Sequence, residues 1–250
     1  MKRISFLSMI LLMNLQVSAQ FKNMLRRESN GPNSISTLTE PQISIQNTHL
    51  LPFFGEINRT PEQATEDEAF VATCKKNFKN KQEASEFFAA RAWEYLGEGH
   101  ADTAMYRFNL AWLLDKGNVE PYWGLGVIAY QHDNHKDAIR FMEKGRQINP
   151  SNVTLMVDLA TIRIKCFMKD ANSEHLKKAN ELLEKAVKIA PDFAEAYQKW
   201  SLAAFQEGKF DKAWAYFHKS FTLEPDSIDQ NFLFELIGKQ ADPKGIFKKQ

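Results

Sequence analysis

The densest group of potential metal ligands in this sequence is the tetrapeptide His132-Asp133-Asn134-His135. Two imidazoles and a carboxylate are ligands that zinc accepts, provided that the side chains converge on one point. The same four residues are also typical of a polar turn between two helices, because Asn and Asp favour turns and helix starts. We therefore expect a turn here, and we predict neither a metal site nor a cofactor.

Signatures of other catalytic chemistry are missing from the sequence. Gly124-Leu125-Gly126 lacks the third glycine and the preceding strand of a dinucleotide-binding loop. There is no Gly-x-Ser-x-Gly nucleophile elbow and no paired-histidine motif of a zinc protease. Most Asp and Glu residues fall on solvent-facing helix positions. The sequence thus predicts no catalytic residue, and we expect a protein that is not an enzyme.

The two cysteines, Cys74 and Cys166, fall in different predicted helices. A single pair does not make a disulfide framework of the kind that holds small secreted domains together. Cysteine behaves as a small apolar residue when it is buried, so we expect two separate buried thiols. A disulfide between the two residues is the alternative.

The chain begins like an exported protein. Lys2 and Arg3 precede an apolar run from Ile4 to Leu15, and Val17-Ser18-Ala19 offers small residues for a cleavage site. The run is too short to span a bilayer comfortably. We predict a signal peptide over residues 1–19, cleavage after Ala19, no stable membrane insertion, and a location in the periplasm or outside the cell. An uncleaved anchor is the alternative.

Charge and composition narrow the class of partner. The 250 residues contain 32 Lys and Arg against 31 Asp and Glu, without a basic run, so we expect no nucleic-acid partner.

Residues 20–58 are rich in polar residues and predict a flexible arm that includes one apolar segment, Leu50–Phe54. Residues 59–82 predict a flanking helix, because Thr60, Pro61 and Gln63 form the pattern of a capping box with proline at the first helical position.

An internal period appears when Ala104, Ala138, Ala179 and Ala213 are aligned. The first two are 34 residues apart, and so are the last two. The residue four positions after each alanine is bulky and apolar: Phe108, Met142, Leu183 and Phe217. The residue seven positions after it is small: Ala111, Gly145, Ala186 and Ser220. The residue twelve positions after it is proline in three cases and lysine in the first: Lys116, Pro150, Pro191 and Pro225.

These features resemble the tetratricopeptide repeat family over residues 85–227. Tyr122-Trp123-Gly124-Leu125-Gly126 is similar to the start of a family unit, and 34 residues is the family period. The resemblance implies an all-α solenoid of four helix pairs, at residues 85–118, 119–152, 153–193 and 194–227. The third pair carries seven extra residues between its helices, and residues 228–250 predict a capping helix and a tail. Arg91 and Arg163 depart from the pattern, since apolar residues are expected there.

The resemblance also implies that a partner lies along a concave groove formed by the first helix of each pair. Carried onto this sequence, the predicted groove residues are Trp93, Trp123, Val127, Tyr130, Thr161, Ile164, Lys165, Gln198, Leu202, Phe205 and Gln206. A groove that clamps a C-terminal carboxylate needs Lys, Asn and Arg, and only Lys165 fits. We expect instead an apolar peptide or helix. In the competing interpretation, the Leu50–Phe54 segment or the helix at Pro61 fills the stripe from within.

The predicted function is a non-enzymatic scaffold or adaptor of the bacterial cell envelope that binds another protein. The alternative is a structural subunit of an envelope or secretion assembly that is held by its outer faces. Fold alone does not decide between them.

Overall fold

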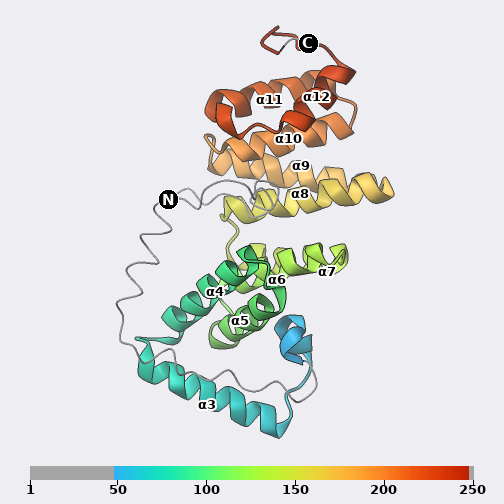
Figure 1. The fold of residues 1–250 in the computed structure, drawn as a ribbon. Helices are drawn as coiled ribbons and strands as arrows, with labels where there is room; N and C mark the ends of the chain where they lie inside the picture. Colours follow the sequence, from blue (N-terminus) through green and yellow to red (C-terminus); the bar gives the residue numbers. More distant parts are fainter. Residues whose placement is uncertain (1–47, 248–250) are drawn as a thin grey trace.

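The computed structural model describes residues 48–247, so the predicted signal peptide and residues 20–47 lie outside the described part. This part contains ten α-helices and no strands, which confirms the predicted all-α class (Figure 1). In chain order the helices are α3 (Pro61–Asn77), α4 (Lys81–Gly97), α5 (Ala101–Leu114), α6 (Val119–Gln131), α7 (His135–Ile148), α8 (Val153–Asp170), α9 (Ser173–Ile189), α10 (Ala194–Gln206), α11 (Phe210–Leu223) and α12 (Gln230–Lys239).

Helices α4 to α11 form four consecutive pairs, α4–α5, α6–α7, α8–α9 and α10–α11, which stack in chain order (Figure 1). Glycines in α6 explain how closely the helices approach one another. A Cβ atom on Gly124 would lie 2.0 Å from the ring of Phe108 on α5, and one on Gly126 would lie 2.7 Å from Met142 on α7. Only glycine fits at these two positions, because protein interiors leave no room for an added methyl group.

Asparagine begins five of these helices. The side chains of Asn80, Asn118, Asn134, Asn152 and Asn172 each accept a backbone N–H in the first turn of the helix that follows. Such a cap stabilises a helix by about 1 kcal/mol. Helix α3 begins with the predicted capping box of Thr60 and Gln63. In α9 the cap is Asn172, and Ser173 is the first residue of the helix.

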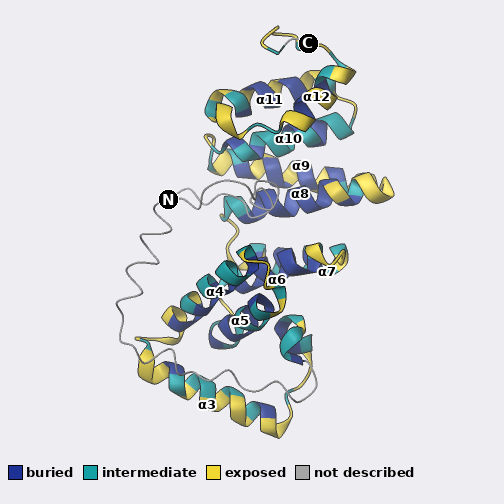
Figure 2. Ribbon diagram, viewed as in Figure 1, coloured by how far each residue is buried: buried dark blue, intermediate teal, exposed yellow. Residues whose placement is uncertain are grey.

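The extra residues of the third pair extend its helices and do not form a loop. Helices α8 and α9 have 18 and 17 residues, whereas α6 and α7 have 13 and 14. The added turns protrude beyond α7, and the end of α8 is exposed there (Figure 2). The two cysteines lie apart, Cys74 in α3 and Cys166 in α8, and both are buried and unpaired. Burial raises the pKa of the Cys74 thiol to about 11.

Residues 48–57, which we call the clip, pack against the second helices of the first two pairs. The ring of Phe53 lies 5.4 Å from Trp112 on α5, 5.1 Å from Tyr122 on α6 and 4.9 Å from Phe141 on α7. Phe54 is buried in a neighbouring cluster of α3, α4 and α5 side chains. The suggestion that the Leu50–Phe54 segment fills the groove is therefore wrong, because its two rings pack on Trp112, Tyr122 and Phe141 and in the cluster of α3, α4 and α5, and none of these contacts is with a predicted groove residue.

A buried amide holds the clip in place. Asn109 of α5 accepts the backbone N–H of Phe53 at 2.7 Å, and its Nδ2 donates to the carbonyl oxygens of His49 and Leu51. The clip turns in the left-handed region, with positive φ at the four residues from Phe53 to Glu56. A left-handed conformation costs about 1–2 kcal/mol for each residue other than glycine. The burial of two phenylalanine rings offsets that cost.

The opposite end of the array is covered by α12. Its residues Phe232, Leu233 and Leu236 are buried against Trp214 and Phe217 of α11. Helix α3 contacts α4 at the other end, so each terminal pair has a flanking helix (Figure 1). The sequence interpretation of α3 as a second possible filler of the groove is wrong as well, since α3 lies at the end of the array.

Candidate functional site

The predicted groove residues lie on the first helices α4, α6, α8 and α10, but they differ in exposure. Trp123, Val127, Thr161 and Ile164 are buried, none more than 4% exposed. The remaining predicted residues keep some surface: Trp93, Tyr130, Gln198, Leu202, Phe205 and Gln206 are half-buried, and Lys165 is exposed. The stripe of predicted groove residues is thus divided, and its accessible apolar members are on α4, at the end of α6 and on α10, whereas α8 offers only Lys165.

Two tryptophans link successive pairs through carboxylates. The indole Nε1 of Trp93 on α4 donates to Glu120 of α6 at 2.7 Å, and that of Trp123 on α6 donates to Asp158 of α8 at 2.9 Å. The two indoles also meet edge to face at 5.3 Å. Because aromatic pairs of this kind add to the energy of area burial, these side chains stabilise the stacking of the first three pairs.

The role of Asp158 was missed from the sequence, although a signal for it was present. Asp158 is the one charged residue in the run from Leu155 to Ile162, and it is fully buried. A buried carboxylate requires hydrogen-bond donors, since an unpaired one would be strongly destabilising. A tryptophan on the preceding first helix, Trp123, is one such donor.

Other predicted groove residues are already engaged in contacts within the fold. The hydroxyl of Thr161 donates to the carbonyl of Val157 one turn earlier in α8. Gln198 of α10 donates to the carbonyl oxygen of Ser227 at 3.2 Å. Phe205 packs edge-on against Phe232 of α12 at 5.5 Å. Leu202 and Gln206 are the other two predicted groove residues on α10, and both are half-buried.

Tyr130 marks the end of α6, beside the turn that contains the histidine-rich tetrapeptide. Its ring lies 5.3 Å from the imidazole of His135, and burial raises the pKa of its hydroxyl. In the turn itself, Asn134 caps α7, and Asp133 accepts from Lys169 at 2.9 Å. Within residues 48–247, no three His, Cys, Asp or Glu side chains converge in a way that could hold a metal ion. The turn is a structural element in this geometry.

Arg163, which departs from the repeat pattern, is buried and bound to a carboxylate. Its Nη2 donates to Glu143 of α7 at 2.7 Å, and the guanidinium of Arg146 contacts the same carboxylate. Burial works to raise the pKa of Glu143, but the two arginines outweigh it and hold the pKa below its usual value. Arg163 thus contributes an ionic link between α7 and α8.

No protein-family model matches the chain, and no curated protein matches it. Solved structures do. TTC0263, a tetratricopeptide repeat protein of Thermus thermophilus, superposes with a TM-score of 0.53 at 16% identity, covering 65% of this chain and 90% of its own. The chain has the tetratricopeptide repeat fold.

Two further structures agree with this fold. PilF of Pseudomonas aeruginosa superposes with a TM-score of 0.52 at 16% identity, over 68% of this chain and 79% of PilF. MamA of Desulfovibrio magneticus RS-1, from residue 41 to its end, gives a TM-score of 0.52 at 17% identity, over 64% of this chain and 86% of MamA. At these identities the tetratricopeptide repeat comparison supports the fold and nothing finer.

Proposed function

We propose that this chain is a non-enzymatic scaffold that binds an apolar segment of another protein along its first helices. The observation that carries the proposal is the set of half-buried apolar side chains on these helices: Trp93 on α4, Tyr130 on α6, and Leu202 and Phe205 on α10. Partly exposed aromatic and aliphatic side chains on a rigid framework are common anchors of protein interfaces. Of the Lys, Asn and Arg residues that clamp a C-terminal carboxylate in related grooves, only Lys165 is present.

The buried tryptophan supports this function indirectly. Trp123 is hydrogen-bonded to Asp158 and packed against Trp93, so it maintains the spacing of the first helices. A rigid framework lowers the entropy cost of binding, because fewer side chains must be ordered when the partner arrives. We therefore assign partner contact to the accessible residues, and a positioning role to Trp123, Val127, Thr161 and Ile164.

Export is part of the proposal and rests on the sequence alone. The basic start, the apolar run and the Val17-Ser18-Ala19 site favour removal of residues 1–19 and a place in the bacterial envelope. Among the residues that the structure describes, no helix is both long and apolar enough to cross a membrane. Sequencing the N-terminus of the protein from a native envelope fraction tests this step. Gln20 as first residue supports it, and an intact Met1 contradicts it.

Site-directed photocrosslinking in the native host tests the binding surface. A photoreactive phenylalanine analogue would replace Tyr130 or Leu202 on the first helices, and Ile148 or Ile189 at the exposed ends of α7 and α9. We expect one common adduct from positions 130 and 202, and none from positions 148 and 189. Adducts from the outer positions alone would contradict the groove and favour the alternative, a structural subunit held by its outer faces.

A substitution pair separates binding from folding. Tyr130→Ala combined with Leu202→Ala should weaken capture of that crosslinked partner about tenfold or more, because half-buried anchors of an interface each contribute more than 1 kcal/mol. The circular dichroism spectrum should stay unchanged. The matched control, Ile148→Ala with Ile189→Ala, removes similar apolar area from the second helices and should retain the partner.

A further inference from the structure

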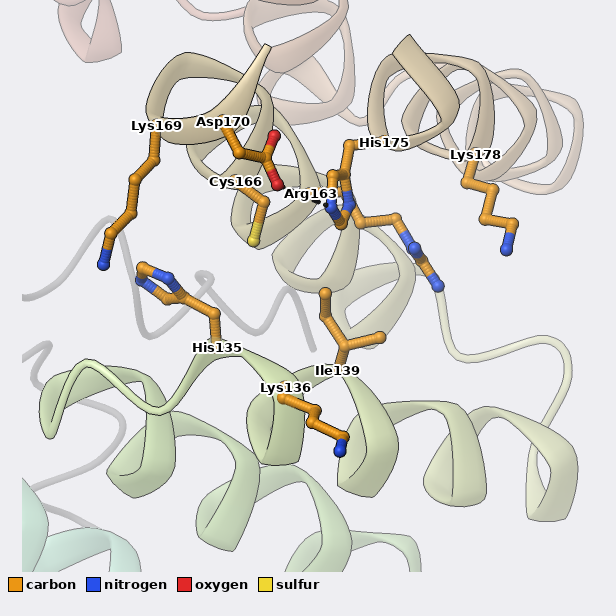
Figure 3. Close-up of a pocket in the computed structure, with 9 residues that line it drawn as sticks. All are labelled: His135, Lys136, Ile139, Arg163, Cys166, Lys169, Asp170, His175 and Lys178. Carbon is orange, nitrogen blue, oxygen red and sulfur yellow. Dashed lines mark ion pairs between the residues drawn. The ribbon is translucent and has the colours of Figure 1, made fainter. Parts of the chain in front are cut away.

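A cavity of about 450 Å³ opens where the lengthened third pair meets the second pair. Figure 3 shows that its lining comes from the start of α7, the end of α8 and the start of α9. Three of its residues, Lys169, Asp170 and His175, belong to the added turns of α8 and α9. The insertion therefore builds this cavity, and the stacking of the four pairs does not require it.

The lining of the cavity is strongly basic. It contains Lys136, Lys169, Lys178 and Arg163, together with the imidazoles of His135 and His175, against the single carboxylate of Asp170. Ile139 and Cys166 supply an apolar floor. The volume lies within the range of about 300–1,000 Å³ that is typical of small-molecule sites.

Two helix starts add to the positive potential. His135 and Lys136 are the first residues of α7, and His175 lies in the first turn of α9. The N-terminus of a helix carries a partial positive charge and free backbone N–H groups, so it favours an anion nearby. His135 and Lys136 of α7 and His175 of α9 all line the same cavity (Figure 3).

Donors beside the cavity are left unsatisfied by the protein. The Arg163 side chain is only 7% exposed, and its Nε has no hydrogen-bond partner although Nη2 binds Glu143. The Nδ1 of His175 is likewise buried without a partner. Buried polar atoms without a partner are costly, so a shift of these side chains toward the oxygen atoms of a bound ligand would be favourable.

Arg163 is held by Glu143 at 2.7 Å, but the carboxylates that contact the other cations of the lining hold them weakly. Asp133 contacts Lys169 at 2.9 Å and His135 at 3.4 Å, but its own side chain is 74% exposed. The other contacts, His175 with Asp170 at 3.5 Å and Lys178 with Glu174 at 3.6 Å, are long. Exposed ion pairs contribute little, so a ligand with several negative charges can compete with them. Lys136 has no ion-pair partner in the described part of the chain.

We propose that this cavity binds a small molecule that carries two or more oxyanion groups, either phosphates or carboxylates. Its multiple acceptors match the arrangement of lysines, arginine and imidazoles from three helices, and charge-assisted hydrogen bonds are the strongest that such a ligand can form. The site meets the groove of the proposed function only at Tyr130, whose ring lies 5.3 Å from His135, and none of the charge variants below changes a groove residue, so anion binding is tested independently of partner binding.

Calorimetric titration of the full chain with pyrophosphate and with citrate tests the proposal, at an ionic strength held constant with chloride. We expect saturable binding of one molecule per chain for at least one of the two. Tighter binding of pyrophosphate would identify phosphate as the preferred group, and tighter binding of citrate would identify carboxylate. If neither anion binds beyond the chloride background, the proposal is wrong.

Matched charge variants locate the site. The triple variant Lys136→Gln, Lys169→Gln, Lys178→Gln should weaken binding by about tenfold or more, since each removed charge costs a few tenths to 1 kcal/mol at an exposed position. The control variant Lys75→Gln, Lys76→Gln, Lys212→Gln has the same net charge and should bind like the unmodified chain. Equal weakening in both variants would show unspecific charge attraction and overturn the site.

Imidazole NMR signals give a readout that does not depend on these variants. The ring protons of His135 and His175 should shift as the anion is added, while those of His49 and His100, outside the cavity lining, should stay in place. Shifts at all histidines alike, or at none during measurable binding, would contradict the assigned cavity.

Discussion

Both ends of the helix array are closed by a segment that turns back onto it, and the two closures use different chemistry. At the N-terminal end the amide of Asn109 binds the backbone of the clip, and Phe53 is inserted between α5 and α7. At the C-terminal end the carboxylate of Asp242 binds the backbone of the tail, and Phe247 is packed on α11. In each case one buried polar side chain satisfies several backbone groups that would otherwise be unpaired.

The C-terminal closure contains groups that titrate. Asp242, whose side chain is inaccessible to solvent, accepts the backbone N–H groups of Lys244, Ile246 and Phe247 at 2.8 to 2.9 Å. Its Oδ1 also lies 2.9 Å from His218 Nε2. The rings of Trp214 and Phe247 lie nearly parallel to the His218 imidazole, with centroids 5.3 and 6.3 Å from it.

The pKa shifts at this end have opposing causes. Burial works to raise the pKa of Asp242, but the backbone N–H groups of Phe247 and Lys244 outweigh it and lower the pKa below its usual value. Burial lowers the pKa of His218 more strongly than the neighbouring Asp242 raises it. The folded tail therefore favours an ionised aspartate and a neutral histidine, and acid opposes both states.

The amide closure at the clip keeps its hydrogen bonds at any pH, whereas the carboxylate closure at the tail loses them in acid. The clip is not free of titrating groups. Burial lowers the pKa of His49, and the Lys144 ammonium lowers that of Glu56. These groups add some acid sensitivity at the N-terminal end, but the bonds that Asn109 makes to the clip backbone do not titrate.

The largest expected effect comes from emptying the clip site. Phe53→Ala should lower the free energy of unfolding by about 3–5 kcal/mol, because it removes a buried ring and leaves a cavity between α5 and α7. Urea denaturation measures the loss. The control Phe234→Ala removes a ring that is 66% exposed and should change stability by less than about 0.5 kcal/mol. Equal effects of the two substitutions would contradict the role of the clip.

A smaller loss is expected from the amide that holds the clip. Asn109→Ala leaves one backbone N–H and two carbonyl groups without their partner, and we expect a loss of about 2–3 kcal/mol. The same substitution in a Phe53→Ala background should cost much less, because the clip is already released. Full additivity in this double-mutant cycle would show that the two residues act separately. Asn231→Ala, at an exposed position of α12, is the matched control.

Release of the tail in acid is expected to have the smallest effect on global stability. It is also the most direct test of the difference between the clip and the tail. Neutral His218 contributes fully to the stability of the folded tail at pH values above 6.5, its ordinary pKa. This contribution is lost as the pH falls below that value. Ionised Asp242 contributes fully to the stability of the folded tail at pH values above 3.8, its ordinary pKa. This contribution is lost as the pH falls through the lowered pKa of the folded state. We therefore expect the tail to open in acid before the clip does.

Hydrogen exchange measured at several pH values follows this release residue by residue. The amides of Lys244, Ile246 and Phe247 should lose protection in acid, while the amide of Phe53 keeps its protection to lower pH. Asp242→Asn should expose the tail amides already at neutral pH, at a cost of about 1–2 kcal/mol or less to global stability, since terminal segments open locally. The control Asp226→Asn should leave them protected. Simultaneous loss of protection at both ends would refute the distinction.

Much of the fold could be predicted from residue spacing. The recurrence of alanine, a bulky residue and proline at 34-residue intervals predicted an all-α array, and Thr60 with Gln63 predicted the start of α3. These features are local: each depends on which residues share one helix face or one helix end. Local patterns of this kind do not depend on tertiary contacts, so they can be recognised in the sequence alone.

Contacts between distant segments could not be predicted in the same way. The apolar segment Leu50–Phe54 was visible, but its position depends on a left-handed turn and on Asn109, which is 56 residues from Phe53. The burial of Trp123 likewise depends on Asp158, which is 35 residues away on another helix. The candidate groove was placed on the correct helices, yet which of its members keep surface depends on these contacts.

Residue spacing was enough to predict the all-α class, the repeat period and the ends of most helices, because hydrophobic spacing and capping act over one or two turns. The packing of the helices was needed to place the clip on the second helices, to show that two tryptophans connect neighbouring pairs, and to show that the insertion lines a basic cavity. Each of these outcomes depends on how whole helix faces meet in three dimensions, and spacing along the chain carries no record of that geometry.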